Sequence, residues 1–305
     1  MKILVIGVGG IGGFIGSYLV NNNYDVTFVA RKKRLSYLKS DGLKLESELG
    51  KIYYPRIKVT EKIPEKESFD IIINTVKLYD FDSVLDEIKN KIKNKPIILP
   101  FQNGIYAEEK LKKKLPDIGT IGAVAQISVF VDENQTIKHV GKLATFFVGG
   151  YDVEKNELLE GFCDNVQKIG LKIIFKKNIK EKIWEKFIFL SAYSGMTTFF
   201  LKSIGQIFED KVLKKKFIDA MFETYNLSKK FGVSFKSDPV EFWLEKIKNM
   251  PFNMTSSMHV DFNNNKKLEL DWLSGSIAVL SKKYNIKCPI HSEIVEGIKK
   301  LNNFS

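Results

Sequence analysis

The sequence predicts an α/β domain with a mostly parallel sheet, followed by an all-α domain. In the first half, short apolar runs that end in turn residues alternate with helical patterns, as expected for parallel strands covered by helices. Beyond about residue 178 strand patterns nearly vanish and helical periodicity continues to the end of the chain. We therefore expect an N-terminal domain over residues 1–178 and a C-terminal domain over residues 179–305, a length that suits two cores.

Five apolar runs are predicted to be strands of the first domain: KILVIG, YDVTFVA, FDIIINTV, PIILPF and IGTIGAVAQI. Helical patterns lie between them, at residues 11–21, 78–92 and 104–114. Short, partly antiparallel strands are expected within residues 42–59, and a further strand within 135–149. A helix at 154–169 and the strand LKIIF complete this domain. Helices of the second domain are expected at 179–200, 211–231, 238–248, 255–282 and 289–302.

The charge balance is basic, with a formal net charge of +12. Only three of the positive residues are arginines, the lysines are scattered, and no basic run is interleaved with aromatic residues as nucleic-acid stacking requires. We therefore expect no nucleic-acid partner. The two cysteines and three histidines have no metal-binding spacing, which predicts no metal site and fits a reducing, cytoplasmic setting.

Two stretches, residues 3–20 and 187–201, carry no charge. The first contains six glycines and is followed by Asn21-Asn22-Asn23 rather than a signal-peptide cleavage site. The second is too short to span a bilayer and contains Ser, Thr, Tyr and Gly. We expect both stretches to be buried elements of a soluble protein, without a membrane partner.

A glycine motif follows the first predicted strand and opens the first predicted helix. It reads Gly7-Val8-Gly9-Gly10-Ile11-Gly12. In the Rossmann pattern the first glycine allows a tight turn, the second lets the backbone approach a pyrophosphate, and the third lets the helix pack closely on the sheet. The helix N-terminus then stabilises the negative charge. We expect these six residues to bind a dinucleotide; the alternative is a glycine-rich turn without a ligand.

The end of the second predicted strand bears on the choice between NAD and NADP. An NAD site usually has Asp or Glu there, which binds the ribose 2′-hydroxyl. This strand ends instead in Arg31-Lys32-Lys33-Arg34, which holds two of the three arginines of the chain. A guanidinium is a planar fork that fits a phosphate and stacks on flat rings. We expect NADP(H), with Arg31 as the main ligand of the 2′-phosphate; the alternative is a solvated, basic helix start.

With these motifs the chain resembles the ketopantoate reductase (2-dehydropantoate 2-reductase) family and, more loosely, the 6-phosphogluconate dehydrogenase-like superfamily. The resemblance runs nearly from end to end. In the first domain it includes the glycine motif, Arg31 and the segments Asn74-Thr75-Val76-Lys77 and Phe101-Gln102-Asn103-Gly104. It implies that Lys77 lies near the nicotinamide, and that Asn103 contacts both cofactor and substrate.

Three segments carry the resemblance into the second domain. Ile183-Trp184-Glu185-Lys186-Phe187 is similar to the family segment with the catalytic lysine, which matches Lys186. Ser256-Ser257-Met258 is similar to the substrate-binding serine motif, with Ser257 at the matching position. Leu268-Glu269-Leu270-Asp271, followed by Gly275, resembles an acidic motif on a long helix, with Glu269 at the functional glutamate.

The resemblance implies NADPH-dependent reduction of 2-dehydropantoate to pantoate, a step toward coenzyme A, in a cleft between the domains. Lys186 would donate the proton if burial or a nearby like charge lowers its pKa. Asn103, Ser257 and Glu269 would position the substrate. Each has a plainer alternative: Lys186, Lys77 and Glu269 as surface charges, Asn103 as a turn residue, and Ser257 as an ordinary residue at a helix N-terminus.

Some positions in the second domain depart from the family pattern. Asparagines of the family are replaced by Leu190, four residues beyond the catalytic lysine, by Ser194 after a further four, and by Ile204; Met254 stands where another asparagine is common. A related NADPH-dependent reductase of another small 2-keto acid is therefore an alternative. So is an NADP(H)-binding sensor without turnover. A homodimer is compatible with the helical second domain.

Overall fold

The structure is a computed structural model and describes residues 1–152 and 156–302. The chain divides into two compact units. The first comprises Met1–Gln102 and Ala107–Ile179, and the second comprises Asn103–Tyr106 and Lys180–Ser305. Residues 103–106 therefore belong with the helical unit, although they lie in the first half of the sequence.

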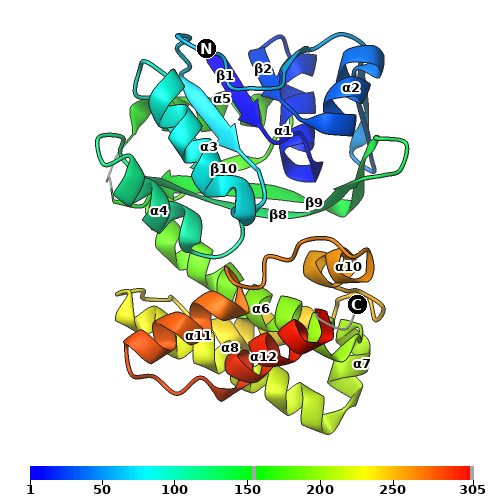
Figure 1. Cartoon of the computed structure of the whole chain (residues 1–305), viewed down its shortest axis with the longest axis vertical. Helices are drawn as coiled ribbons and strands as arrows, with labels where there is room; N and C mark the ends of the chain where they lie inside the picture. Colours follow the sequence, from blue (N-terminus) through cyan, green and yellow to red (C-terminus); the bar gives the residue numbers. More distant parts are fainter. Residues whose placement is uncertain (153–155, 303–305) are drawn as a thin grey trace. The chain divides into compact units, whose positions relative to one another are not determined.

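The first unit contains a five-stranded parallel sheet (Figure 1). Its strands, in spatial order, are β5 (Lys58–Thr60), β2 (Asp25–Val29), β1 (Lys2–Ile6), β6 (Ile71–Asn74) and β7 (Ile97–Pro100). Every residue of β6 and β7 is buried, as is typical of parallel strands covered on both faces. Because all five strands run parallel, the carboxyl ends of β1, β2 and β6 lie at one edge, where dinucleotides bind in open α/β sheets.

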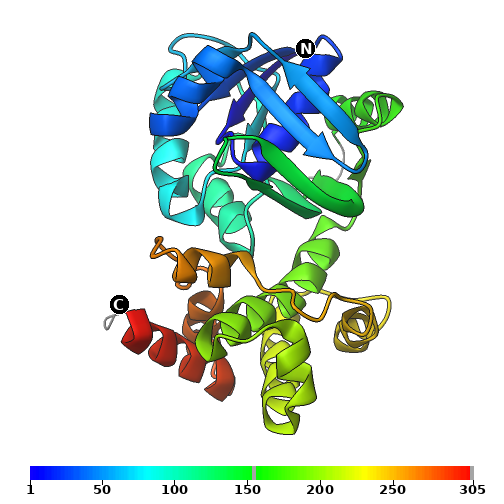
Figure 2. The ribbon, with the colours of Figure 1, turned by 90° about the vertical axis from the view of Figure 1, so that its right-hand side faces the viewer.

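A second sheet completes this unit. Its main path is β10 (Ile173–Phe175), β9 (Ile137–Gly150), β3 (Leu43–Ser47) and β4 (Gly50–Tyr54), and β8 (Ile121–Val131) pairs with β9. Figure 2 shows the light-blue β3–β4 hairpin beside the green β8–β9 hairpin. The prediction of short antiparallel strands within residues 42–59 is confirmed.

Helix α1 (Gly10–Asn21) packs between these two sheets. Its Phe14 ring lies 6.0 Å from that of Phe146 in β9, and a Cβ on Gly16 would lie 2.3 Å from the ring of Phe28 in β2. A helix with a sheet on either side needs apolar side chains all round, which explains the lack of charge in residues 3–20. The remaining helices of this part are α2 (Lys32–Asp41), α3 (Leu78–Lys91), α4 (Tyr106–Lys114) and α5 (Glu157–Lys168).

The second unit is helical and is built around α6 (Ile179–Phe200). A Cβ on Gly195 would come within 3.0 Å of atoms of Ser274 and Ile294, so α6 packs closely on α11 and α12. Figure 1 shows α8, α11 and α12 beside α6. The remaining elements are α7 (Ile204–Glu209), α8 (Lys211–Lys230), α9 (Pro239–Ile247), α10 (Ser257–Asn263), α11 (Ser274–Lys283) and α12 (Pro289–Asn302).

The predicted long helix at residues 255–282 is wrong. Helix α10 ends at Asn263, and α11 begins only at Ser274. Asn265 adopts a positive φ of 50° and the Lys266 N–H bonds the Asp261 carbonyl, which closes the end of α10. Asparagine tolerates this left-handed conformation better than most residues, so the Asn263-Asn264-Asn265 run overrides the helical periodicity.

The helices of the described chain also bear on membrane insertion. Within residues 1–152 and 156–302, no helix combines the length and the hydropathy needed to cross a membrane.

Candidate active site

The glycine turn lies between β1 and α1, at the carboxyl edge of the parallel sheet. Gly7 has a φ of +89°, which favours glycine, and a Cβ there would lie 2.9 Å from the Val76 nitrogen. A Cβ on Gly12 would lie 2.1 Å from the Gly7 carbonyl oxygen. Side chains are therefore excluded at both positions, at Gly7 by the segment that follows β6 and at Gly12 by the turn itself.

Gly9 differs, because a Cβ there would meet no atom within 4 Å. This residue is the N-cap of α1 and supplies no side-chain cap, so the first N–H groups of the helix remain available to an anion. An open space over Gly9, next to uncapped N–H groups, is the geometry that a pyrophosphate requires. Gly10 is instead confined by β8: its Cβ would lie 2.6 Å from the Val129 carbonyl oxygen.

Arg34 supports this turn from α2, a role that the sequence did not reveal. Its Nε donates to the Val8 carbonyl oxygen at 2.8 Å, and its guanidinium also bonds the Gln135 carbonyl oxygen in the β8–β9 connection. Desolvation lowers the pKa of Arg34 to about 10, so it remains cationic at neutral pH. Arg34 thus links the glycine turn to the second sheet. The only sign of this role in the sequence was the choice of arginine in a chain whose positive residues are nearly all lysines.

Arg31 is the N-cap residue of α2, just after β2, and its side chain is exposed. Its guanidinium pairs with the Glu87 carboxylate at 3.1 Å. The two side chains line a cavity of about 350 Å³ together with Glu61, Lys62 and Lys91. The cavity thus offers three cationic side chains at the end of β2. A phosphate bound there would compete with Glu87 for Arg31.

Lys77 lies at the end of β6, where it is the N-cap residue of α3 and is half-buried. The nearby backbone is fixed by Gln102, whose amide donates to the carbonyl oxygens of Asn74 and Val76 at 3.1 and 3.0 Å. The amide thereby joins the ends of β6 and β7. This arrangement orients the segment that leads into Lys77.

The second unit brings together Lys186 of α6 and Asn103, which are 83 residues apart in the sequence. The Lys186 Nζ donates to the Asn103 Oδ1 at 2.8 Å. Gly104 follows with a φ of +89°, so the Asn-Gly turn is a backbone requirement as well as the means of presenting Asn103. Desolvation lowers the pKa of Lys186 to about 8, and the negative charge of Glu269 opposes part of this effect.

Glu269 lies in the loop before α11 and not on a long helix, which corrects the sequence prediction. Its side chain is 8% exposed, and Leu268 and Leu270 on either side are also buried. Its carbonyl oxygen accepts from the N–H groups of Trp272 and Leu273, both at 3.1 Å. This turn holds a buried carboxylate close enough to affect the pKa of Lys186.

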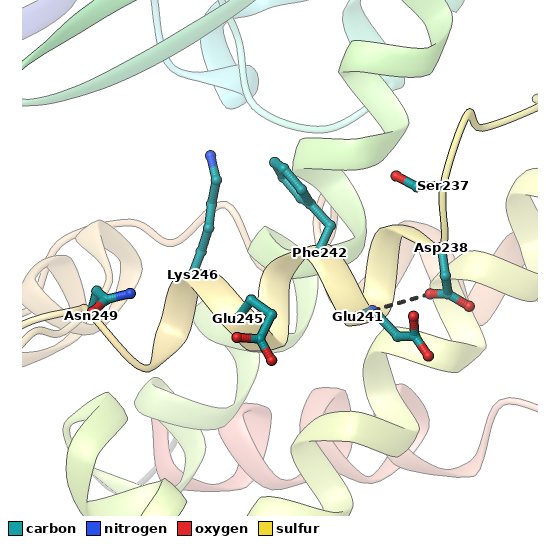
Figure 3. A pocket seen from close by; sticks show the side chains of 7 residues that line it. All are labelled: Ser237, Asp238, Glu241, Phe242, Glu245, Lys246 and Asn249. Carbon is teal, nitrogen blue, oxygen red and sulfur yellow. Dashed lines mark hydrogen bonds between the residues drawn. The ribbon is translucent and has the colours of Figure 1, made fainter.

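A hollow of about 500 Å³ lies along α9 and is drawn in Figure 3. Phe242 and Lys246 point to one side of the helix, while Glu241 and Glu245 point to the other. Asp238 is occupied in capping the helix through the Val240 and Glu241 N–H groups. The hollow contains none of the predicted site residues, and its side chains do not converge on a common point. The predicted site residues therefore lie outside this hollow.

Comparison with known proteins identifies the family. The family model described as "Ketopantoate reductase PanE/ApbA" matches residues 3–152, and its C-terminal counterpart matches residues 178–302. The chain belongs to the ketopantoate reductase family. This confirms the resemblance and the fold class predicted from the sequence, and the protein is an oxidoreductase of this family.

The similar proteins differ in what they are named. An uncharacterized oxidoreductase, YkpB, of Bacillus subtilis is 28% identical and covers 98% of both chains. A 2-dehydropantoate 2-reductase of Pyrococcus horikoshii is 27% identical over 95% of this chain and 94% of its own. Among solved structures, a PanE/ApbA family ketopantoate reductase from Ralstonia eutropha has a TM-score of 0.90 at 19% identity, covering 99% of each chain. A D-mandelate dehydrogenase bound to NADH and anilino(oxo)acetate has a TM-score of 0.88 at 18% identity, covering 99% of this chain and 98% of its own.

In this ketopantoate reductase family member, Ser257 lies at the first position of α10 and is exposed. Its neighbour Ser256 is the N-cap residue, accepting from the His259 N–H at 3.1 Å and bonding the Thr197 hydroxyl at 2.8 Å. Capping is therefore the task of Ser256, which leaves the Ser257 hydroxyl at the surface. A substrate contact of Ser257 stays a prediction.

Proposed function

We propose that this protein reduces a small 2-keto acid with NADPH. The first substrate to test is 2-dehydropantoate, the substrate named for several relatives, which would yield pantoate for the synthesis of pantothenate and coenzyme A. The observation that carries the proposal is the half-buried Lys186 ammonium, bonded to Asn103 and with its pKa lowered to about 8. A group with this pKa is protonated at neutral pH and still gives up its proton readily.

The first unit supplies residues that fit the dinucleotide. The pyrophosphate would lie over Gly9 and the N-terminus of α1, and the 2′-phosphate would bind Arg31 in the cavity shared with Lys62 and Lys91. Lys77 would lie toward the nicotinamide. When bound, NADPH supplies the hydride that reduces the carbonyl carbon.

Residues of the second unit would handle the proton and the substrate. Lys186 would donate a proton from Nζ to the carbonyl oxygen, and its positive charge would stabilise the negative charge that develops there. Asn103 would hold the ammonium in position through its Oδ1 and could contact the substrate through its amide nitrogen. Glu269 would keep Lys186 protonated, since its charge raises the pKa of the lysine, and Ser257 would bind the substrate carboxylate.

A second candidate is the same reaction on a different 2-keto acid. Leu190 favours it, because an apolar side chain lies one helical turn beyond Lys186, where the family pattern has a polar one. The activity named for a structural neighbour, D-mandelate dehydrogenase, concerns a different acid from pantoate.

Steady-state oxidation of NADPH and NADH with a panel of 2-keto acids tests the proposal. We expect turnover of at least one acid, with NADPH preferred over NADH in kcat/KM. Failure of every acid to oxidise a cofactor that nevertheless binds would support the sensor alternative. Turnover with a clear preference for NADH would contradict the role of Arg31.

A further inference from the structure

We propose that the carbon chain of the substrate lies against Leu190, so that the enzyme prefers 2-keto acids whose substituent is a hydrocarbon over those that carry a hydroxyl group. This inference rests on the proposed function, in which Lys186 serves the keto group. It assigns the class of substrate from Leu190, which lies on the same helix, α6, as Lys186.

The burial pattern of α6 shows where a ligand has access. From residue 183 to residue 198, every residue of the helix is buried except Lys186 and Leu190. Residues four apart on a helix lie on one face with their Cβ atoms about 6 Å apart. A ligand that reaches the Lys186 Nζ from outside this unit therefore meets Leu190 as the neighbouring accessible side chain on α6.

The two ends of this face fix the orientation of the ligand. One turn before Lys186 lies the ammonium of Lys182, held by the Glu185 carboxylate at 2.8 Å. One turn beyond Leu190 lies Ser194, which is only 1% exposed, and its hydroxyl donates to the Ser191 carbonyl oxygen at 3.4 Å. The face thus has the Lys186 ammonium and the paired Lys182 toward the N-terminus of α6, and Leu190 forms its apolar end.

The polar partners of Lys186 also favour this orientation. Asn103 and Glu269 supply amide and carboxylate groups close to the ammonium, where the keto group would be. The substituent beyond the keto carbon would extend toward Leu190. A hydroxyl placed there would lose its water without a partner on α6, whereas a methyl group would gain from burial.

Two acids that differ by a single oxygen atom test this inference. They are 2-dehydropantoate and 3,3-dimethyl-2-oxobutanoate, which has a methyl group in place of the hydroxymethyl group. We expect the wild-type enzyme to prefer the second acid by about tenfold in kcat/KM, the size that one unpartnered buried hydroxyl commonly produces. The ratio of the two kcat/KM values is measured on one enzyme sample, so the fraction of active protein cancels.

Leu190→Asn is the informative variant, and Leu190→Met is its matched control. The asparagine offers a partner to the hydroxyl, so we expect the ratio to move toward 2-dehydropantoate by about tenfold or more. The methionine keeps the apolar surface, so the ratio should remain within about threefold of wild type. Leu190 is half-buried, and thermal melting of both variants checks that they fold.

The outcomes separate the two levels of the proposal. Turnover of both acids, with a wild-type preference for 2-dehydropantoate or a ratio that Leu190→Asn does not change, would overturn the substrate assignment and leave the reductase function in place. A complete lack of turnover with any 2-keto acid would overturn the proposed function and this inference together.

Discussion

The lowered pKa of Lys186 predicts the pH dependence of the reaction. Because desolvation brings this pKa to about 8, the ammonium should be about nine-tenths protonated at pH 7 and about one-tenth protonated at pH 9. If the protonated form is the active one, kcat/KM for the keto acid should be level below pH 7 and fall about tenfold by pH 9. A lysine with the ordinary pKa of 10.5 would keep the rate level over this range.

Glu269→Gln should shift the pH profile of the reaction in a known direction. The Glu269 carboxylate raises the pKa of Lys186, so its replacement by a neutral isostere should lower that pKa and move the falling limb to lower pH. One nearby charge typically has an effect of about one pH unit or more. Glu245→Gln is the matched control, because this carboxylate is 71% exposed and pairs with Lys248 on α9. Its profile should coincide with wild type.

The assay is the initial rate of NADPH oxidation at low keto acid concentration and saturating NADPH, from pH 6 to pH 10. The reasoning is refuted if the wild-type rate stays level to pH 10. It is also refuted if Glu269→Gln moves the limb to higher pH. Melting temperatures across the same range show whether a loss of rate comes from unfolding.

Three further predictions concern the cofactor-binding unit. Arg31→Ala should raise the KM for NADPH by about 10- to 100-fold, since one charge-assisted phosphate contact contributes about 1.5–3 kcal/mol, and change the KM for NADH by less than about threefold. Arg56→Ala, at an exposed arginine, is the control. Equal effects on both cofactors would contradict the role of Arg31. Arg34→Ala should weaken the binding of NADPH and NADH alike, because the bond to the Val8 carbonyl supports the turn under the pyrophosphate. Arg34→Lys should recover part of this binding. A selective loss of NADPH binding would contradict the supporting role of Arg34. Gly12→Ala should destabilise the fold by about 3 kcal/mol or more, because its Cβ would lie 2.1 Å from the Gly7 oxygen. By contrast Gly161→Ala on α5, where a Cβ meets nothing within 4 Å, should stabilise by about 0.5–1 kcal/mol in chemical denaturation; similar melting curves for the two variants would contradict the steric argument.

The glycine turn and the parallel sheet could be predicted because their causes are local. Gly7 is favoured by its positive φ and Gly12 is required by its contact with Gly7, both within one strand–turn–helix unit. Buried strands appear as apolar runs. The separate second sheet depends on pairings such as β3 with β9, about 90 residues apart, for which strand patterns give no register. The break in the long helix did have a local signal, the three asparagines from residue 263.

The hydrogen-bond partners of the site residues could not be predicted from the sequence. The bond from Lys186 to Asn103 joins positions 83 residues apart, and among so many lysines only the family resemblance singled out this one. The division of tasks between Ser256 and Ser257 depends on which residue begins α10. The inward direction of Arg34 depends on how α2 packs, so the sequence predicted a phosphate ligand at Arg31 but no separate role for Arg34.

A single-turnover experiment tests the central claim most directly. Wild-type enzyme and Lys186→Ala are each loaded with NADPH, and the oxidation of the bound cofactor is followed after mixing with excess 2-keto acid at pH 7. We expect both proteins to bind NADPH with similar affinity, and the variant to oxidise it at least about 100-fold more slowly, the usual contribution of a general acid. Equal rates in the two proteins would contradict the assignment of Lys186 as the proton donor, and a wild-type protein that does not bind NADPH would contradict the whole account.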